Sequence, residues 1–166
     1  MEKTSHHELS PREIILDTFA FARTRILITA IDLEIFTYIS KGKKTLHELA
    51  QITKTQGRAL EILLNNLCAM EYLQKKDRLY ELTSLSRFFL VKGKKMYYGD
   101  YVKHVDLSWD SWFRLTEVVR TGKPSLPTGT AEKEGFDYYQ QLVPLLFNTT
   151  HLVAVAGAKA LGIGKE

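Results

Sequence analysis

The segment from Thr45 to Thr83 constrains the fold most, because it contains the start and stop signals of two helices and a hairpin. Residues 45–48 have the form of a capping box. In this motif the Thr45 side chain accepts a hydrogen bond from the backbone N–H of Glu48, and the Glu48 side chain accepts one from the backbone N–H of Thr45. A second helix is predicted after the polar turn at 53–57, since its apolar residues recur at i, i+3, i+4 and i+7: Leu60, Leu63, Leu64, Leu67 and Met70. Two short alternating runs then flank a charged turn at 76–78, as in a β-hairpin. A helix-turn-helix followed by a hairpin is a winged helix.

The helix predicted before this segment is apolar around most of its circumference. Ser10, Pro11 and Glu13 form its start signal. Its apolar residues are Ile14, Ile15, Leu16, Phe19, Phe21, Ala22, Ile26, Leu27 and Ile28. A helix that is apolar on two sides must be buried on two sides. It is either a central core helix or a helix packed between its own domain and a partner chain. We favour the second, because so much exposed apolar surface would promote association.

The rest of the chain is predicted to be helical. The first helix of the winged module is expected over Ala30–Ile39, and an aromatic-rich helical pair follows from Met96 to Val119. Gly and Pro at 121–124 break that pair, and two further helices are expected over about 136–146 and 148–161. The predicted fold class is therefore mainly α, a winged helix with a small β-hairpin and additional N- and C-terminal helices. The predicted division is a flexible N-terminus (1–10), a winged-helix domain (11–95) and a helical extension (96–166).

Composition points to an ordinary intracellular protein. The chain is 45% hydrophobic and 25% charged, and its net charge of +4 is compatible with nucleic acid without requiring it. Its single cysteine, Cys68, cannot form an intrachain disulfide and favours a reducing compartment. No apolar run reaches the length of a membrane span, and the N-terminus lacks a signal-peptide pattern. We expect a soluble cytoplasmic protein that has no membrane partner.

Motifs for catalysis, cofactors and metals are not recognisable in the sequence. His104 and His151 each stand alone on helical segments, where packing is the ordinary role, and the adjacent His6 and His7 lack further ligands. The glycine-rich end at 157–164 follows a helix, whereas a dinucleotide-binding loop follows a strand. We therefore assign no catalytic, cofactor-binding or metal-binding residues.

DNA binding is the first use to test for a winged helix. The second predicted helix offers Arg58, Asn65 and Asn66 to base edges, but it also carries Glu61. The hairpin turn is basic, yet the total positive charge is small for phosphate neutralisation. A winged-helix transcription regulator therefore remains as the alternative hypothesis, and nucleic acid is disfavoured as a partner.

Several segments together resemble one family. They are Leu33–Phe36, Thr45–Ala50, Arg58–Leu64, Glu71–Leu73, Tyr80–Thr83, Trp112 with Val119–Pro124, and Phe136–Phe147. In this order they resemble the N-terminal, dimerising winged-helix region of small-molecule O-methyltransferases that use S-adenosylmethionine. That group contains plant phenolic and bacterial polyketide or carotenoid methyltransferases. The resemblance covers nearly everything from Ser10 to the end.

The resemblance implies a homodimer and a substrate-binding wall. The helix from Pro11 would intertwine two subunits, which fits its two apolar sides, and its predicted interface residues are Ile15, Phe19, Ala22 and Ile26. The aromatic helices would close one side of a substrate pocket, with Trp109, Trp112, Phe147 and His151 as its predicted residues. The run 147–151 resembles a pocket-lining Phe-Asn-x-x-Met stretch of plant members, with His in the Met position.

In this family the final helix leads into a Rossmann-like domain that holds the cofactor and the catalytic base. This chain reaches Glu166 where the first strand of that domain would begin, so we expect the fragment itself to be non-catalytic. The intact enzyme would transfer a methyl group from S-adenosylmethionine to a hydroxyl on a small aromatic or polyketide-like molecule. A stand-alone ligand-binding protein that has lost its catalytic domain is a further alternative.

Overall fold

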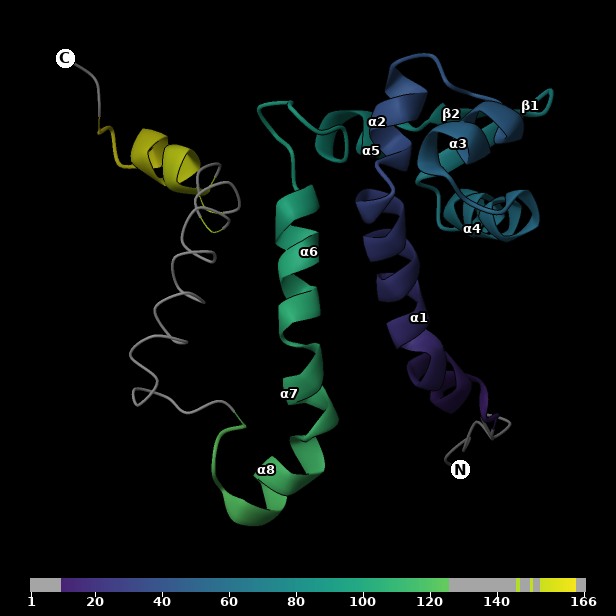
Figure 1. Cartoon of the computed structure of the whole chain (residues 1–166). Helices are drawn as coiled ribbons and strands as arrows, with labels where there is room; N and C mark the ends of the chain where they lie inside the picture. Colours follow the sequence, from purple (N-terminus) through teal and green to yellow (C-terminus); the bar gives the residue numbers. More distant parts are fainter. Residues whose placement is uncertain (1–9, 126–145, 147–149, 151–152, 164–166) are drawn as a thin grey trace, which may run out of the picture.

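The long N-terminal helix spans two environments. The computed structural model describes residues 10–125, 146, 150 and 153–163, and α1 runs over Arg12–Asp32 (Figure 1). Its last turns are buried in the body of the protein, whereas its first turns project away from it. The predicted start differs in detail: Ser10 Oγ accepts the Arg12 N–H at 3.3 Å, but Pro11 is the cap residue and no side-chain capping box forms.

The helix predicted over Ala30–Ile39 is wrong in its boundaries, because the chain breaks inside it. Glu34 adopts a left-handed conformation with φ of +51°, and α2 then runs over Ile35–Ser40. The break changes the direction of the chain, so that apolar residues before and after it enter the same core. Residues buried on the two sides of the break are Ile28, Ala30, Ile31, Ile35, Phe36 and Ile39.

The two helices of the helix-turn-helix lie where the sequence predicts them. α3 (Leu46–Thr53) begins with the predicted capping box: the Glu48 N–H donates to Thr45 Oγ1 at 3.2 Å, and the Thr45 N–H donates to Glu48 Oε2 at 3.1 Å. α4 (Gly57–Ala69) is capped by the Gln56 side chain. Its leucine stripe is buried, as its spacing predicts.

The wing is a two-stranded antiparallel hairpin. β1 (Leu73–Lys76) pairs with β2 (Leu79–Leu82) in a register that places Lys76 opposite Leu79. The two turn residues, Asp77 and Arg78, both have positive φ, as a two-residue hairpin turn requires. α5 (Ser84–Phe89) follows, capped by Thr83. The winged helix is therefore confirmed.

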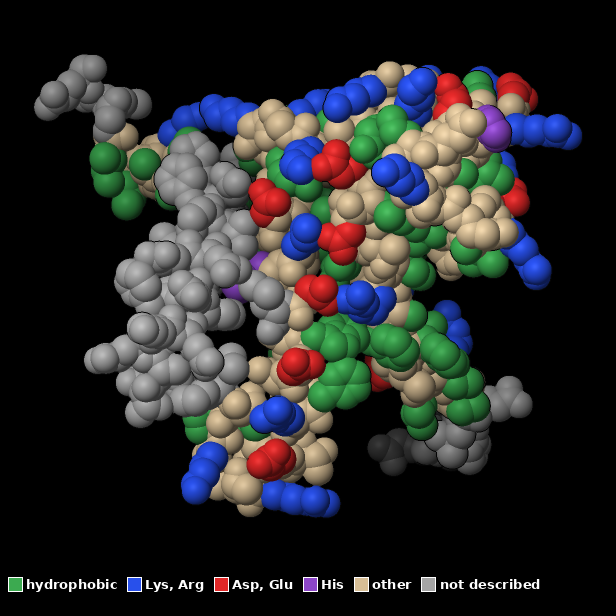
Figure 2. All heavy atoms as spheres, in the orientation of Figure 1, with side chains coloured by type: hydrophobic (Ala, Val, Ile, Leu, Met, Phe, Trp, Pro, Cys, Tyr) green, Lys and Arg blue, Asp and Glu red, His purple; other side chains and the backbone are tan. Residues whose placement is uncertain are grey.

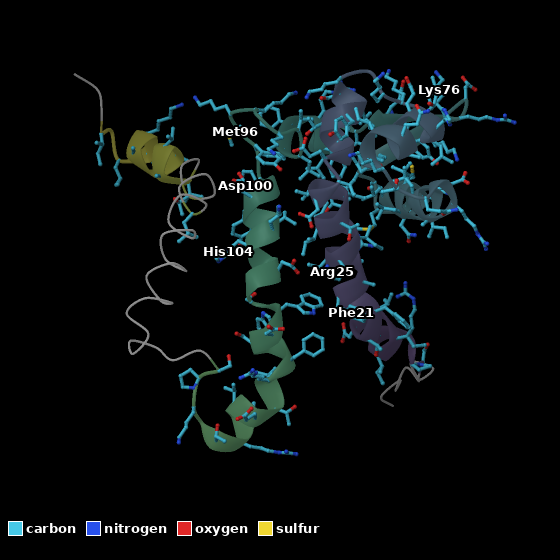
Figure 3. The ribbon with its side chains drawn as sticks, viewed as in Figure 1. Phe21, Arg25, Lys76, Met96, Asp100 and His104 are labelled. Atoms are coloured by element: carbon cyan, nitrogen blue, oxygen red, sulfur yellow. The ribbon has the colours of Figure 1, made fainter. Side chains whose placement is uncertain are left out.

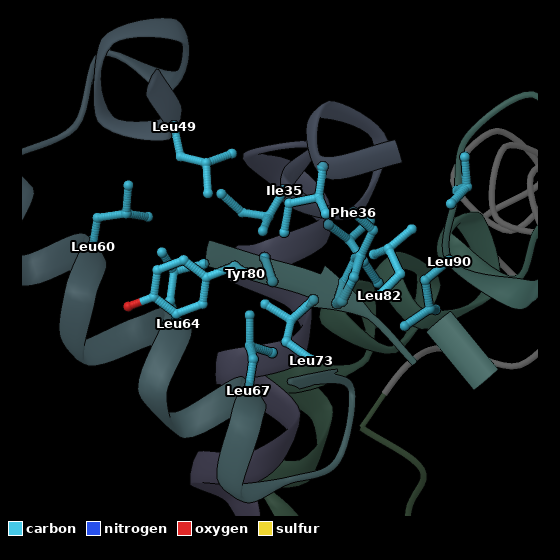
Figure 4. Close-up of a cluster of buried hydrophobic side chains, with 14 residues drawn as sticks. Ile35, Phe36, Leu49, Leu60, Leu64, Leu67, Leu73, Tyr80, Leu82 and Leu90 are labelled. Atoms are coloured by element: carbon cyan, nitrogen blue, oxygen red, sulfur yellow. The ribbon is translucent and has the colours of Figure 1, made fainter. Parts of the chain in front are cut away.

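These elements enclose one apolar core (Figure 4). Tyr80 projects from the wing into its centre between α3 and α4, and its hydroxyl reaches Asn65 Oδ1 at 3.3 Å. The core consists of Ala30, Ile31, Ile35, Phe36, Ile39, Leu49, Leu60, Leu64, Leu67, Leu73, Tyr80, Leu82, Leu90 and Val91. We call α2 to α5, with the last turns of α1, the winged-helix body.

The aromatic segment forms three consecutive helices where the sequence predicts a pair. α6 (Gly99–Leu107), α7 (Trp109–Phe113) and α8 (Leu115–Thr121) are separated by single residues, and the first of them runs beside α1 (Figure 1). Gly122, with φ of +66°, ends α8 at the predicted break. Residues 153–160 are helical, inside the helix predicted over 148–161, while the helix predicted over 136–146 lies outside the described residues except for its last position. No helix in the described part of the chain is long and apolar enough to cross a membrane.

Candidate functional site

The first half of α1 exposes large apolar side chains in consecutive turns. Figure 2 shows hydrophobic side chains gathered over the lower part of this helix. The exposed members are Ile14, Ile15, Leu16, Phe19 and Phe21, which we call the α1 apolar segment. Phe19 is 61% exposed. A patch of this kind on a protein surface indicates an interaction site.

The four predicted interface residues fall into two groups. Ile15 and Phe19 are exposed in the single chain, and Ala22 is half-buried. Ile26 packs against the core of its own chain. These four residues therefore lead along α1 from an exposed surface into the winged-helix body, and their role in dimerisation stays a prediction.

An apolar groove separates α1 from α7. It has a volume of about 670 Å³ and brings together the predicted wall residues Trp109 and Trp112. Its full lining is Phe21, Thr24, Arg25, Trp109, Trp112 and Phe113. The other two predicted wall residues, Phe147 and His151, lie outside the described residues.

Sequence reasoning missed the α1 side of this groove. Phe21 and Arg25 share one helix face because they are four residues apart, and Figure 3 shows them on α1 next to α6. That spacing was readable in the sequence. No local pattern reveals the tertiary contact: only the structure shows that α6 packs beside α1 and that residues of α7 line the same groove.

Two ion pairs fasten α6 to α1. The Arg25 guanidinium pairs with Asp106 and also lies over the Trp109 ring, 5.6 Å from its centroid. Lys103 Nζ lies 2.9 Å from Asp32 Oδ1. All four charged side chains are about half exposed, so each pair contributes little to stability and acts chiefly on the relative position of the helices.

A half-buried tyrosine lies just before α6, at the upper end of the same helix pair. Burial raises the pKa of Tyr97 to about 12, and the carboxylates of Asp100, Glu34 and Asp32 add to the effect. The ring covers Gly99, where a Cβ would overlap its hydroxyl. This arrangement is a packing feature, since a phenol with so high a pKa stays protonated at neutral pH.

Three lysines of the winged-helix body lie next to carboxylates. Lys75 Nζ lies 4.9 Å from the Tyr80 ring centroid and 3.4 Å from Glu61 Oε1. The Tyr80 side chain, and to a smaller extent the Glu61 carboxylate, raises the pKa of this lysine. Lys44 and Lys43 lie near Glu81 and Glu48 respectively. Positive charge therefore remains on the body, but nothing in the described residues supports the DNA-binding alternative. Within the described ranges, no group of three potential metal ligands occurs.

Comparison with known proteins identifies this fold. The family described as the O-methyltransferase dimerisation domain matches residues 17–92. The chain is 32% identical over 116 residues to 3-hydroxy-5-methyl-1-naphthoate 3-O-methyltransferase of Streptomyces sahachiroi, covering 69% of this chain and 34% of that protein. It is 31% identical over 112 residues to the S-adenosyl-L-methionine-dependent methyl transferase PigF of a Serratia species, covering 67% and 32%.

The fold itself recurs in a solved structure. An O-methyltransferase family protein from Burkholderia thailandensis superposes with a TM-score of 0.76 at 21% identity, over 89% of this chain and 45% of that one. The chain spans about a third of the length of the two curated relatives. Residues 17–92 of this chain, which contain most of α1 and the winged helix, are an O-methyltransferase dimerisation domain.

Proposed function

We propose that this chain is the dimerising, substrate-side part of an S-adenosylmethionine-dependent O-methyltransferase that acts on a hydroxyl of a small aromatic compound. The names of two relatives support this, since one methylates a hydroxynaphthoate and the other is S-adenosylmethionine-dependent. The proposal includes a homodimer. It also includes a cytoplasmic location, which the single cysteine of the sequence favours.

The observation that carries the proposal is that α1 has one half buried in its own chain and one half exposed. Its last turns are covered by the chain's own core, while the α1 apolar segment has no cover in the described part of the chain. Burying one such side chain stabilises an assembly by about 1.5–3 kcal/mol. A second copy of a domain whose family is named for dimerisation is the natural cover.

In this proposal, the aromatic residues of α7 form part of the substrate-binding wall. Trp109 and Trp112 supply flat apolar rings on the groove, whose volume of about 670 Å³ lies in the range of small-molecule pockets. With Phe147 and His151 they would orient an aromatic acceptor and exclude water from its hydroxyl. Bound S-adenosylmethionine would supply the methyl group.

The proposal assigns no part of the binding site for that cofactor to the described residues. Among them the strands are β1 and β2 alone, and neither leads into a glycine-rich loop of the kind that holds a nucleotide at a helix N-terminus. We therefore assign no step of methyl transfer to them. Titration of S-adenosylmethionine into the 166-residue chain should produce no binding heat, and micromolar binding would overturn this assignment.

Sedimentation equilibrium tests the dimer with a matched pair of variants. Ile15→Asp places a charge on the α1 apolar segment, and Ile62→Asp places one at an equally apolar, exposed position on α4. The wild type and Ile62→Asp should be dimers at micromolar concentration. Ile15→Asp should be a monomer with unchanged helical content. A monomeric wild type, or a fully dimeric Ile15→Asp, would overturn the proposal.

A further inference from the structure

We infer that Arg25 is a positioning residue of the proposed substrate-binding wall, because it fixes the orientation of the Trp109 ring and the angle between α6 and α7. The inference rests on the proposed function for the role of that wall. It goes beyond the family match, which ends at residue 92 and includes neither of these two helices.

Arg25 contacts residues on both sides of a break between two helices. α6 ends at Leu107 and α7 begins at Trp109, so Ser108 alone separates them. Ser108 has φ of −91° and ψ of 0°, which lies in the bridge region rather than in the helical one. The Arg25 guanidinium pairs with Asp106 before the break and lies over the Trp109 ring after it. One side chain of α1 therefore braces the joint between α6 and α7.

The backbone of Arg25 belongs to a packed part of α1, beside α6 (Figure 3). Ile26 packs against the core of the winged-helix body, and Ile28 is fully buried. The Arg25 carbonyl accepts a hydrogen bond from Thr29 Oγ1 at 2.8 Å, one turn further along. The guanidinium thus extends from a fixed base, whereas α7 contributes no residue to the core. The position of α1 is therefore transmitted to α7 through this side chain.

The guanidinium suits this double contact because it is planar. Its N–H groups can donate to the Asp106 carboxylate while its face lies on an aromatic ring. A lysine ammonium has no such face, so a lysine at position 25 would keep the ion pair and lose the stacked contact. Since the Arg25 and Asp106 side chains are about half exposed, the contact orients the helices more than it stabilises the fold.

Holding Trp109 also orients the other two aromatic rings of α7. Trp112 and Phe113 follow three and four residues later on the same helix, so they turn with it. The rings of Trp109 and Phe113 meet edge to face, with centroids 6.0 Å apart. All three rings line the groove between α1 and α7. Arg25 therefore sets the shape of the surface that an aromatic acceptor would meet.

Tryptophan spectroscopy of the 166-residue chain tests the inference. Trp109 and Trp112 are the only tryptophans of the sequence, so Trp112→Phe leaves Trp109 as the sole reporter. In this background, Arg25→Met should weaken the tryptophan band in near-ultraviolet circular dichroism and increase the amplitude of nanosecond ring motion in time-resolved anisotropy. Loss of a cation–π contact at an exposed site corresponds to a shift of about two- to five-fold in the equilibrium between held and released ring.

Two further variants make the result specific to the guanidinium. Arg25→Lys keeps the charge and should lose part of the Trp109 signal, which also carries the test if Arg25→Met does not fold. Arg23→Met is the matched control, because Arg23 is exposed on the same helix and does not line the groove. It should retain the full signal. Far-ultraviolet circular dichroism should show the same helical content in every variant.

The outcomes separate this inference from the proposed function. An unchanged Trp109 signal in Arg25→Met, or an equal loss in Arg23→Met, would overturn the positioning role and leave the proposed function standing. A full signal in Arg25→Lys would overturn the planar contact. A monomeric wild type in sedimentation would overturn the proposed function alone, since the contacts of Arg25 lie within one chain.

Discussion

The winged-helix body and the two projecting elements use apolar residues in opposite ways. In the body, Leu64 and Tyr80 are fully buried by neighbours from the same chain. On α1 and α7, Phe19 and Trp112 are mostly exposed although they are equally apolar. The difference lies in the packing available: the hairpin, α2–α5 and the last turns of α1 surround the core, whereas the first turns of α1 and the helices α7 and α8 contribute no residue to it.

This contrast separates folding from assembly within one domain. The body has the contacts that a single chain needs to fold. The α1 apolar segment takes no part in that core and is 51–72% exposed, and the proposed dimer would explain its composition. Substitutions in the two regions should therefore change different measured quantities.

The largest effect is expected in the body. Leu64→Ala removes a fully buried side chain and should lower the free energy of unfolding by about 2–5 kcal/mol, because a cavity remains in the core. Ile62→Ala, on the same helix but 57% exposed, should change it by less than about 0.5 kcal/mol. Urea unfolding compares the two. Equal effects would show that α4 is not packed as described.

A smaller effect is expected at the capping box of α3. Thr45→Ala removes the acceptor of the Glu48 N–H and should destabilise the chain by about 1 kcal/mol. Thr45→Ser keeps the hydroxyl and should retain most of that stability. If both variants unfold at the wild-type urea concentration, the cap makes no net contribution.

The same cap should give a pH dependence with a definite sign. Hydrogen bonds from the Thr45 backbone and side chain lower the pKa of Glu48 below its ordinary 4.5. The stability it contributes is therefore present above about pH 4.5 and is lost as the pH falls through the lower folded value. Between about pH 5 and 3, the free energy of unfolding should therefore depend less on pH in Glu48→Gln than in the wild type. An unchanged slope would argue against the charged cap.

The smallest effect is expected between α1 and α6. Asp106→Asn removes the partner of Arg25 and should lower stability by less than about 1 kcal/mol, since the pair is about half exposed. Asp110→Asn, at an exposed site on α7, is the control. Urea unfolding at low and high salt measures both. A loss of several kcal/mol from Asp106→Asn would show that the pair holds the fold together.

Local signals in the sequence were sufficient for the winged-helix body. The capping box at Thr45, the leucine stripe of α4 and the hairpin turn are all short-range patterns, and the structure confirms each. The break at Glu34 was not predictable in this way. A left-handed glutamate has no strong local preference, and the core imposes the turn by drawing in residues from both sides.

The candidate site was predictable only in part. Aromatic density indicated Trp109 and Trp112, but Phe21 and Arg25 enter through a contact between segments more than 80 residues apart. No periodicity encodes such a contact. The predicted roles of Phe147 and His151 stay predictions, because these residues lie outside the described part of the chain.

Hydroxyl-radical footprinting tests the central claim most directly, because it reports the cover of individual side chains. Phe19 and Phe88 have nearly equal exposure in the single chain, 61% and 56%, and lie on α1 and on the body respectively. At micromolar concentration Phe19 should be oxidised several-fold more slowly than Phe88, and dilution below the dimer dissociation constant should remove the difference. Equal oxidation of the two at every concentration would show that no second copy covers the α1 apolar segment.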